Sequence, residues 1–193
     1  MVYPFHRQHI AQIPAIELYQ KPTTEPVSVF EAQTYIRTEG DAEYNLIEQM
    51  LLSARTSAER YMRLSIMTQK WKITYGNEAP KEVELYSGPA TAIDSVKLVD
   101  KQGTETIFDP LNYYISADQK YLVFEQTPSA HKIEIIYTAG IATDASEVPE
   151  TIKQGILAHT AHLYERGAEA TTGKAAVSDE AKSFLNIYRK ISL

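Results

Sequence analysis

Two histidines and a glutamate recur at intervals of three residues in the segment AHTAHLYE, as His159, His162 and Glu165. On an α-helix each residue advances by about 100°, so His159 and His162 lie about 60° apart and Glu165 a further 60° round. The two imidazoles could share a metal ion, but the third ligand is poorly placed and the H-E-x-x-H spacing of zinc helices is missing. His159 also belongs to an apolar stripe. The pattern favours a buried or interface histidine; a metal-dependent hydrolase using His159 and His162 is the alternative.

Two further chemical patterns are incomplete. The segment GAEATTGKA has five residues between Gly167 and Gly173, where a phosphate-binding P-loop has four, and Ala rather than Ser or Thr follows Lys174. It also follows a helical pattern rather than a strand, so we interpret it as a linker. No G-x-S-x-G elbow occurs. The chain has no cysteine, which excludes disulfides and thiolate ligands. We therefore expect no catalytic residue, no cofactor and no metal.

The bulk composition indicates a globular chain. It has 193 residues and a net charge of −6, so a chain-wide basic footprint for nucleic acid is absent. An acidic surface would still suit a protein past which DNA must slide. No apolar run approaches the ~20 residues that span a bilayer, and the first ten residues lack the apolar centre of a signal peptide. We expect a soluble protein, made in the cytoplasm, with no membrane partner.

Helical patterns occupy both ends of the chain. Ser28 and Glu31 have capping-box spacing, which predicts a short helix over about residues 29–37. Asp41 follows as the cap of a longer amphipathic helix, about 42–64. Charged residues are expected to cover the remaining, solvated surface of this helix: Glu43, Glu48, Arg55, Glu59 and Arg63.

The apolar period changes to alternation between residues 67 and 139. In MTQKWKITY apolar and polar residues alternate, which is typical of a strand with one solvated face. Further strand-like runs follow, separated by Gly, Asn, Asp and Pro turn signals. They are KEVELY, IDSVKLVD, TETIF, NYYIS, KYLVFEQ and KIEIIYTAG.

The helical period then returns. Pro149 stands at a plausible first turn. Ser178 or Asp179 would cap a last helix, EAKSFLNIYRKI. The predicted fold class is α+β, a small helical bundle of N- and C-terminal helices with an inserted antiparallel β subdomain. The predicted division is an extended arm, 1–25, a helical connector domain, 26–66 and 141–193, and the inserted β subdomain, 67–140.

Two terminal segments are candidates for contacts with partners. The proline-rich arm is too apolar to lie free in water, so it lies on its own domain or on a neighbouring subunit. The C-terminal helix ends basic and apolar, which favours docking. The candidate contact residues are Phe5, Ile10, Ile13, Ile16, Tyr19, Phe184, Tyr188, Arg189, Lys190, Ile191 and Leu193.

Motifs in order along about residues 26–190 carry a family resemblance. The first half has Pro26-Val27, Arg37, Gly40-Asp41, Tyr61 and Thr68-Gln69-x-Trp71. The second has DPLNYYI, IIYTAG and VPETIKQGILAHTAHLYERG, with Gly155 in place of the usual alanine. The sequence thereby resembles the head–tail connector (adaptor) proteins of tailed phages and gene transfer agents.

The resemblance implies a structural virion protein at the head–tail junction. Such proteins form a ring, commonly of twelve copies, under the portal protein. The ring extends the channel, through which DNA passes without sequence-specific binding, and receives the tail or a stopper protein. In this chain the arm would contact a neighbouring subunit or the portal, and the C-terminal segment the portal. The β subdomain would face outward or towards the tail. A monomeric ligand-binding module, with an apolar pocket in the β subdomain, is a further alternative.

Overall fold

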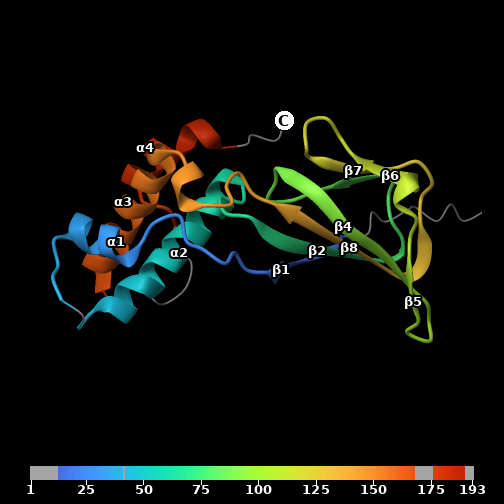
Figure 1. Cartoon of the computed structure of the whole chain (residues 1–193), viewed down its shortest axis with the longest axis horizontal. Coiled ribbons are helices and arrows are strands. Elements are labelled where there is room, and N and C mark those ends of the chain that lie inside the picture. Colours follow the sequence, from blue (N-terminus) through green and yellow to red (C-terminus); the bar gives the residue numbers. More distant parts are fainter. Residues whose placement is uncertain (1–12, 41, 168–175, 190–193) are drawn as a thin grey trace, which may run out of the picture.

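The computed structural model describes residues 13–40, 42–167 and 176–189. A helical part and a β part lie end to end along the long axis of the molecule (Figure 1). The helices are α1 (Val29–Ile36), α2 (Tyr44–Met62), α3 (Glu150–Arg166) and α4 (Asp179–Leu185), with 3-10 turns η1 (Pro110–Asn112), η2 (Ala145–Glu147) and η4 (Asn186–Tyr188). The strands are β1 (Ala15–Gln20), β2 (Gln69–Glu78), β3 (Glu82–Glu84), β4 (Ala90–Val99), β5 (Glu105–Ile107), β6 (Tyr113–Ile115), β7 (Tyr121–Phe124) and β8 (Ser129–Ala139). The predicted α+β fold class is confirmed.

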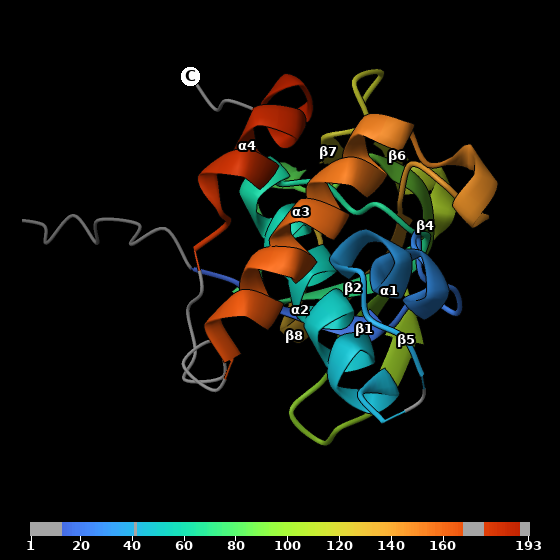
Figure 2. The ribbon, with the colours of Figure 1, turned by 90° about the vertical axis from the view of Figure 1, so that its left-hand side faces the viewer.

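The four helices pack around one apolar core at one end of the molecule (Figure 2). The predicted capping box is present at α1, where the Ser28 hydroxyl accepts from the Glu31 backbone N–H and the Glu31 carboxylate accepts from Ser28 N–H. The apolar stripe of α2 is buried against α3, and α3 also packs on α1 and α4. No helix in the described residues is both long and apolar enough to cross a membrane.

Two predicted helix limits differ from the structure. The N-cap of α2 is Glu43, with no side-chain cap, and Asp41 lies outside the described residues. Glu43 instead accepts a hydrogen bond from the Tyr164 hydroxyl at 2.7 Å, which ties the start of α2 to the end of α3. The last helix begins at the predicted cap, Ser178, but ends at Leu185 and continues only as the turn η4.

The β part consists of two antiparallel sheets. A five-stranded sheet has the order β1-β2-β8-β4-β5, and a three-stranded sheet has the order β3-β7-β6. Alternation places one face of the larger sheet in an apolar core, which includes Ile73, Ile135 and Tyr137. The residues between them along β2 and β8 carry lysine, threonine and glutamate to the other face. All seven strands expected between residues 67 and 139 are present.

Strand β1 was not expected from the sequence, which predicted only an extended arm. Residues 15–20 pair antiparallel with β2, with Ala15 opposite Thr74 and Leu18 opposite Trp71. This part of the arm therefore lies on its own domain. Every residue of the strand is exposed, so its register depends on backbone pairing more than on burial.

The buried apolar residues form two separate clusters. One lies among the helices and takes in Met67 and Ala142 at its edge, and the other begins at Ile73 and ends at Ala139. The division of the chain at residues 67 and 140 remains a prediction, and the two cores support it.

Helix α4 approaches α3 closely because position 155 has no side chain. A Cβ at Gly155 would lie 2.7 Å from Leu185 Cδ2 and 2.8 Å from Leu185 Cγ. Leu185 is fully buried, so its position over Gly155 fixes where α4 lies. The alanine of the family pattern does not fit this packing.

We expect Gly155→Ala to lower the free energy of unfolding by about 1–2 kcal/mol, because Leu185 must leave its rotamer or move α4. In a Leu185→Ala background the same substitution should instead stabilise the protein by about 1 kcal/mol, through helix propensity alone. Urea unfolding of the four proteins in this double-mutant cycle measures both effects. Equal effects in the two backgrounds would contradict the contact.

Candidate functional site

His159 and His162 lie on one face of α3, as predicted, but only His159 is buried. Its Nδ1 accepts a hydrogen bond from the Ser178 backbone N–H at 3.4 Å, at the start of α4. The two rings stack with centroids 6.1 Å apart, and Glu165 is exposed on the next turn. In residues 13–40, 42–167 and 176–189, no three His, Cys, Asp or Glu side chains are grouped to hold a metal ion. The hydrogen bond that the structure shows for His159 is therefore with the start of α4.

Burial and the neighbouring charge of His162 lower the pKa of His159 from 6.5 to about 4. The unfolded chain binds a proton at this imidazole at a higher pH than the folded chain does. Stability is therefore lost as the pH falls from about 6.5 towards 4.

We expect the free energy of unfolding of the wild-type protein to fall by about 3 kcal/mol more than that of His159→Gln over this pH range. The glutamine can still accept from Ser178 N–H but does not titrate. Urea unfolding at a series of pH values measures the difference, with His162→Gln as the control that keeps the buried imidazole. Parallel pH profiles for wild type and His159→Gln would show that His159 is not buried as a neutral group.

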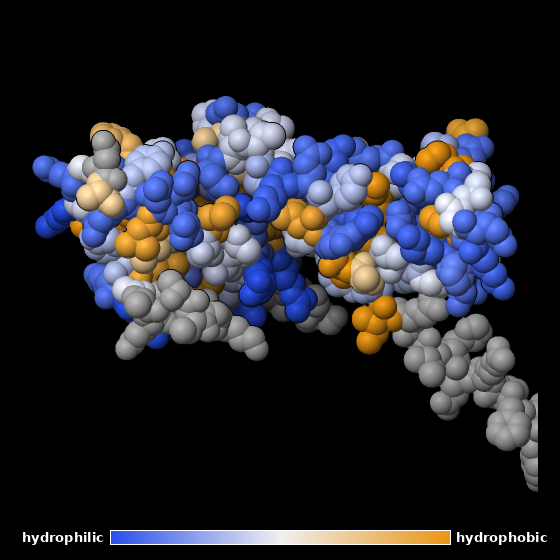
Figure 3. All heavy atoms as spheres, turned by 90° about the horizontal axis from the view of Figure 1, so that it is seen from below, coloured by the Kyte–Doolittle hydropathy of each residue, from blue (hydrophilic) through white to orange (hydrophobic). Residues whose placement is uncertain are grey.

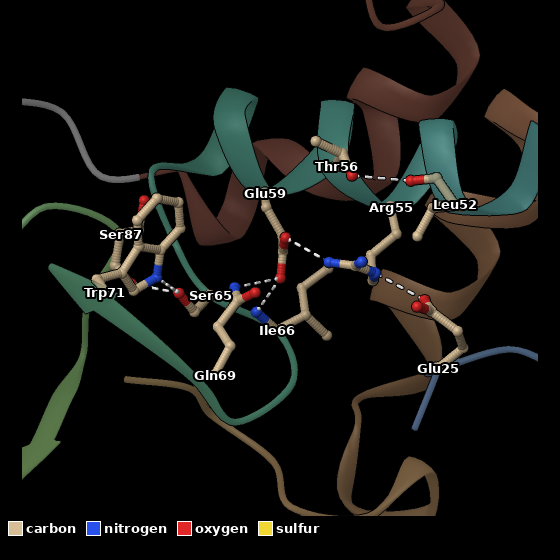
Figure 4. A network of polar contacts seen from close by, with 10 residues as sticks. All are labelled: Glu25, Leu52, Arg55, Thr56, Glu59, Ser65, Ile66, Gln69, Trp71 and Ser87. Carbon is tan, nitrogen blue, oxygen red and sulfur yellow. Dashed lines mark hydrogen bonds and ion pairs between the residues drawn. The ribbon is translucent and has the colours of Figure 1, made fainter. Parts of the chain in front are cut away.

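A network of polar contacts, with Arg55 and Glu59 buried at its centre, lies where the helical and β parts join (Figure 4). Arg55 on α2 is buried and pairs with Glu59 at 2.7 Å, one turn along the helix, and with Glu25 at 2.6 Å, in the segment that follows β1. The second oxygen of Glu59 accepts from Ile66 N–H at 2.9 Å and from the Gln69 amide at 3.1 Å. One carboxylate thus links α2 to the chain that enters β2.

The prediction that Arg55 and Glu59 lie on the solvated surface of the helix is wrong, because both are buried. Only the spacing of four residues signalled that they pair. Burial of both was not visible, because it is caused by residues 64–69 turning back over α2. That burial raises the pKa of Glu59, although the Arg55 charge opposes the rise.

Two other contacts hold the same junction. The Trp71 indole N–H donates to Ser65 Oγ at 3.1 Å, and Ser65 donates to the Ser87 carbonyl at 2.6 Å (Figure 4). After β8 the chain returns to the helical part at Gly140, and a Cβ there would lie 2.7 Å from the backbone of Thr68. Gly140 has φ +154°, so glycine is required here for close approach as well as for conformation. The segment that enters β2 and the segment that leaves β8 are therefore packed backbone against backbone.

We expect Glu59→Gln to lower the free energy of unfolding by about 3 kcal/mol, because it leaves a buried guanidinium with only one carboxylate. Asp179→Asn is the matched control, since it removes one partner of the solvent-screened pair Lys182–Asp179 and should leave the free energy of unfolding nearly unchanged. Thermal and urea unfolding measure both. A Glu59→Gln protein as stable as the control would mean that the junction does not depend on this pair.

The predicted contact residues divide between exposed and half-buried positions. Ile13 is 95% exposed, and Ile16 and Tyr19 are exposed on β1. Phe184 and Tyr188 instead pack against the helical core, and Arg189 lies over the Tyr61 ring with 5.1 Å from Cζ to the centroid. The remaining predicted contacts lie outside the described residues: Phe5, Ile10, Lys190, Ile191 and Leu193.

Three strongly exposed apolar side chains were missed by the sequence analysis. Ile187 in η4 is 81% exposed, Leu111 in η1 is 84% exposed and Phe30 on α1 is 76% exposed. Asp109 accepts from the Leu111 backbone N–H at 3.0 Å and so caps the turn η1. The apolar periodicity of the sequence could not predict their exposure, because all three residues lie in short turns or at the start of a helix.

The β part has a hollow of about 600 Å³ between the ends of β4 and β8. Most of its lining residues are polar, among them Asp100, Lys101, Gln102 and Thr104, and it is open to solvent. This is not the enclosed apolar pocket that a ligand-binding module would require.

The fold is shared with chains of gene transfer agent (GTA) particles. A chain of "Neck of empty GTA particle computed with C6 symmetry" aligns with TM-score 0.74 and 16% identity over 93% of this chain and 97% of its own. A chain of "Virion of native gene transfer agent (GTA) particle" aligns with TM-score 0.76 and 18% identity over 92% and 96%. A chain of "Neck of native GTA particle computed with C12 symmetry" gives 0.64 and 18% over 91% and 97%.

These matches confirm, at the level of the fold, the resemblance carried by the sequence motifs. They cover the helical and β parts together, so the whole arrangement is shared and not only one of its halves. No protein-family model and no curated protein matches the chain.

Proposed function

We propose that this protein is a structural head–tail connector of a tailed phage or gene transfer agent particle. The observation that carries the proposal is the shared fold over more than nine-tenths of both this chain and neck and virion chains of gene transfer agents. The ordered motifs of the connector family, from Pro26-Val27 to the helix VPETIKQGILAHTAHLYERG, support it independently.

The role we propose is mechanical and not enzymatic. The buried Arg55–Glu59 pair and the packed crossings at Gly140 support a rigid joint between the helical and β parts. A wall segment of a DNA channel needs such stiffness and needs little attraction for phosphates, which the net charge of −6 suits. His159 serves the packing of α4 in this reading.

The partners we propose are copies of the same chain, the portal protein, and a tail or stopper protein. Two of the similar structures were computed with C6 and C12 symmetry, which supports a ring, and twelve copies is the number we propose. Ile187 and the segment after it would dock on the portal, and the β part with Leu111 would face the tail. The protein would then reside at the head–tail junction of the virion.

Binding to heads tests the proposal directly. Purified protein should co-sediment saturably, at a portal-like multiplicity, with portal-bearing heads that lack tails. Folded protein that does not bind intact portals would overturn the connector function, and zinc analysis of the same protein would then test the hydrolase alternative.

Two arms of the same assay test the orientation. Ile187→Lys should abolish binding to heads while circular dichroism and the melting temperature stay near those of the wild type, because Ile187 is 81% exposed. Deletion of residues 186–193 should also abolish binding and keep the circular dichroism, but it should lower the melting temperature, because Tyr188 packs against the helical core. Leu111→Lys is the matched control, since Leu111 is equally exposed but lies in the β part, and it should bind heads normally. Normal binding by the deletion variant would remove the C-terminal segment from the portal contact.

A further inference from the structure

Strand β1 leaves one edge of the five-stranded sheet open. It stands at the end of the order β1-β2-β8-β4-β5 and pairs only with β2. The backbone groups on its other side have no ladder partner among the described residues. Such an edge is a template for pairing with another chain.

The open edge lacks most of the features that protect edges of monomeric proteins. The strand AIELYQ contains no lysine and no internal proline, and its one charged residue, Glu17, pairs with Lys72 on the neighbouring strand. A register shift between Leu18 and Gln20 limits the regular edge to residues 15–18. Ile16 and Leu18 share the face of Ile73 and Trp71, yet both are exposed because the smaller sheet does not cover them. Seen from below, patches of apolar surface interrupt the polar surface of the molecule, in its β part as well as its helical part (Figure 3).

Strand β5 forms the opposite edge of the same sheet, and its residues lie in the same rows of paired residues as those of β1. Pairing runs in one row across all five strands, from Ala15 to Thr74, Glu134, Lys97 and finally Ile107 on β5. Ile107 is 57% exposed, and β5 covers only the last three residues of β4. The sheet therefore ends in two different edges that are level with each other, and both carry exposed aliphatic side chains.

The charges at the two edges are already neutralised within the chain. Lys72 pairs with Glu17 beside β1, and Lys97 pairs with Glu105 at 2.8 Å beside β5. Joining the edges would therefore bury no unpaired charge, which is the usual penalty for such a contact.

We propose that neighbouring copies of this chain join edge to edge, with β1 of one copy beside β5 and the adjoining part of β4 of the next. The inference rests on the proposed ring. A closed ring needs a heterologous contact, in which each copy offers two different surfaces to its two neighbours. The two level edges of this sheet meet that requirement, and backbone pairing fixes the register between copies.

Cysteine cross-linking tests the contact, because the chain has no cysteine of its own. The test protein is the full chain with Ala15→Cys and Ile107→Cys, assembled on portal-bearing heads and treated with a short bismaleimide. Within one copy the two positions are four strand spacings apart, about 19 Å, so they should not cross-link to each other. We expect a ladder of covalent multimers on a denaturing gel, and only monomer from either single-cysteine variant. Ala15→Cys with Tyr114→Cys is the matched control, since Tyr114 is equally exposed but belongs to the smaller sheet.

A second variant measures the contribution of the edge to assembly. Ile16→Lys with Leu18→Lys should leave the melting temperature within a few degrees of the wild type, because both residues are exposed, but should lower ring assembly at least tenfold. Tyr114→Lys should assemble normally.

The outcomes separate the two proposals. Rings that form without the ladder, and that tolerate the double lysine variant, would overturn the edge contact and leave the connector function standing. A chain that stays monomeric in solution and on portal-bearing heads would overturn both.

Discussion

The ion pair between Arg55 and Glu59 is the interaction on which the arrangement of the molecule depends. Its two residues are one turn apart on α2, yet they are buried, because the chain from Ser65 to Gln69 turns back over them. Glu25 adds a second carboxylate from the segment after β1. A buried charge is costly unless all its hydrogen-bonding groups are used, so few other placements of these three segments are tolerated. We infer that the pair helps to fix how the helical part is joined to β2.

Polar contacts of this kind also join the two apolar cores. Each half buries its own hydrophobic side chains, and neither core crosses the junction. At the junction, polar contacts and the close backbone approach at Gly140 hold the two halves together. Hydrogen bonds are directional, so they fix one arrangement more specifically than apolar contacts would. For a protein proposed to line a channel, a stiff joint of this kind keeps the end that contacts the portal in fixed relation to the sheet.

The sheet itself carries the proposed assembly. The smaller sheet covers the inner face except at β1, and paired lysines and carboxylates lie on the outer face. Within the described residues, the two edges of this sheet carry backbone groups that have no ladder partner. Backbone pairing between edges depends on geometry more than on side-chain identity. Structures only 16–18% identical to this chain keep the same fold, and a contact made by the backbone would tolerate such divergence.

The sequence by itself determined that helices occupy both ends of the chain, that seven strands lie between them, and that a capping box stands at Ser28. Apolar periodicity and local capping depend on residues that are near neighbours in the sequence. Its ordered motifs also predicted the family whose fold the chain shares. Only the tertiary structure decided that Arg55 and Glu59 are buried, that β1 joins the sheet, and that Ile187 and Leu111 are exposed. Burial and strand pairing depend on segments that are distant in sequence, and no local pattern records which of them will meet.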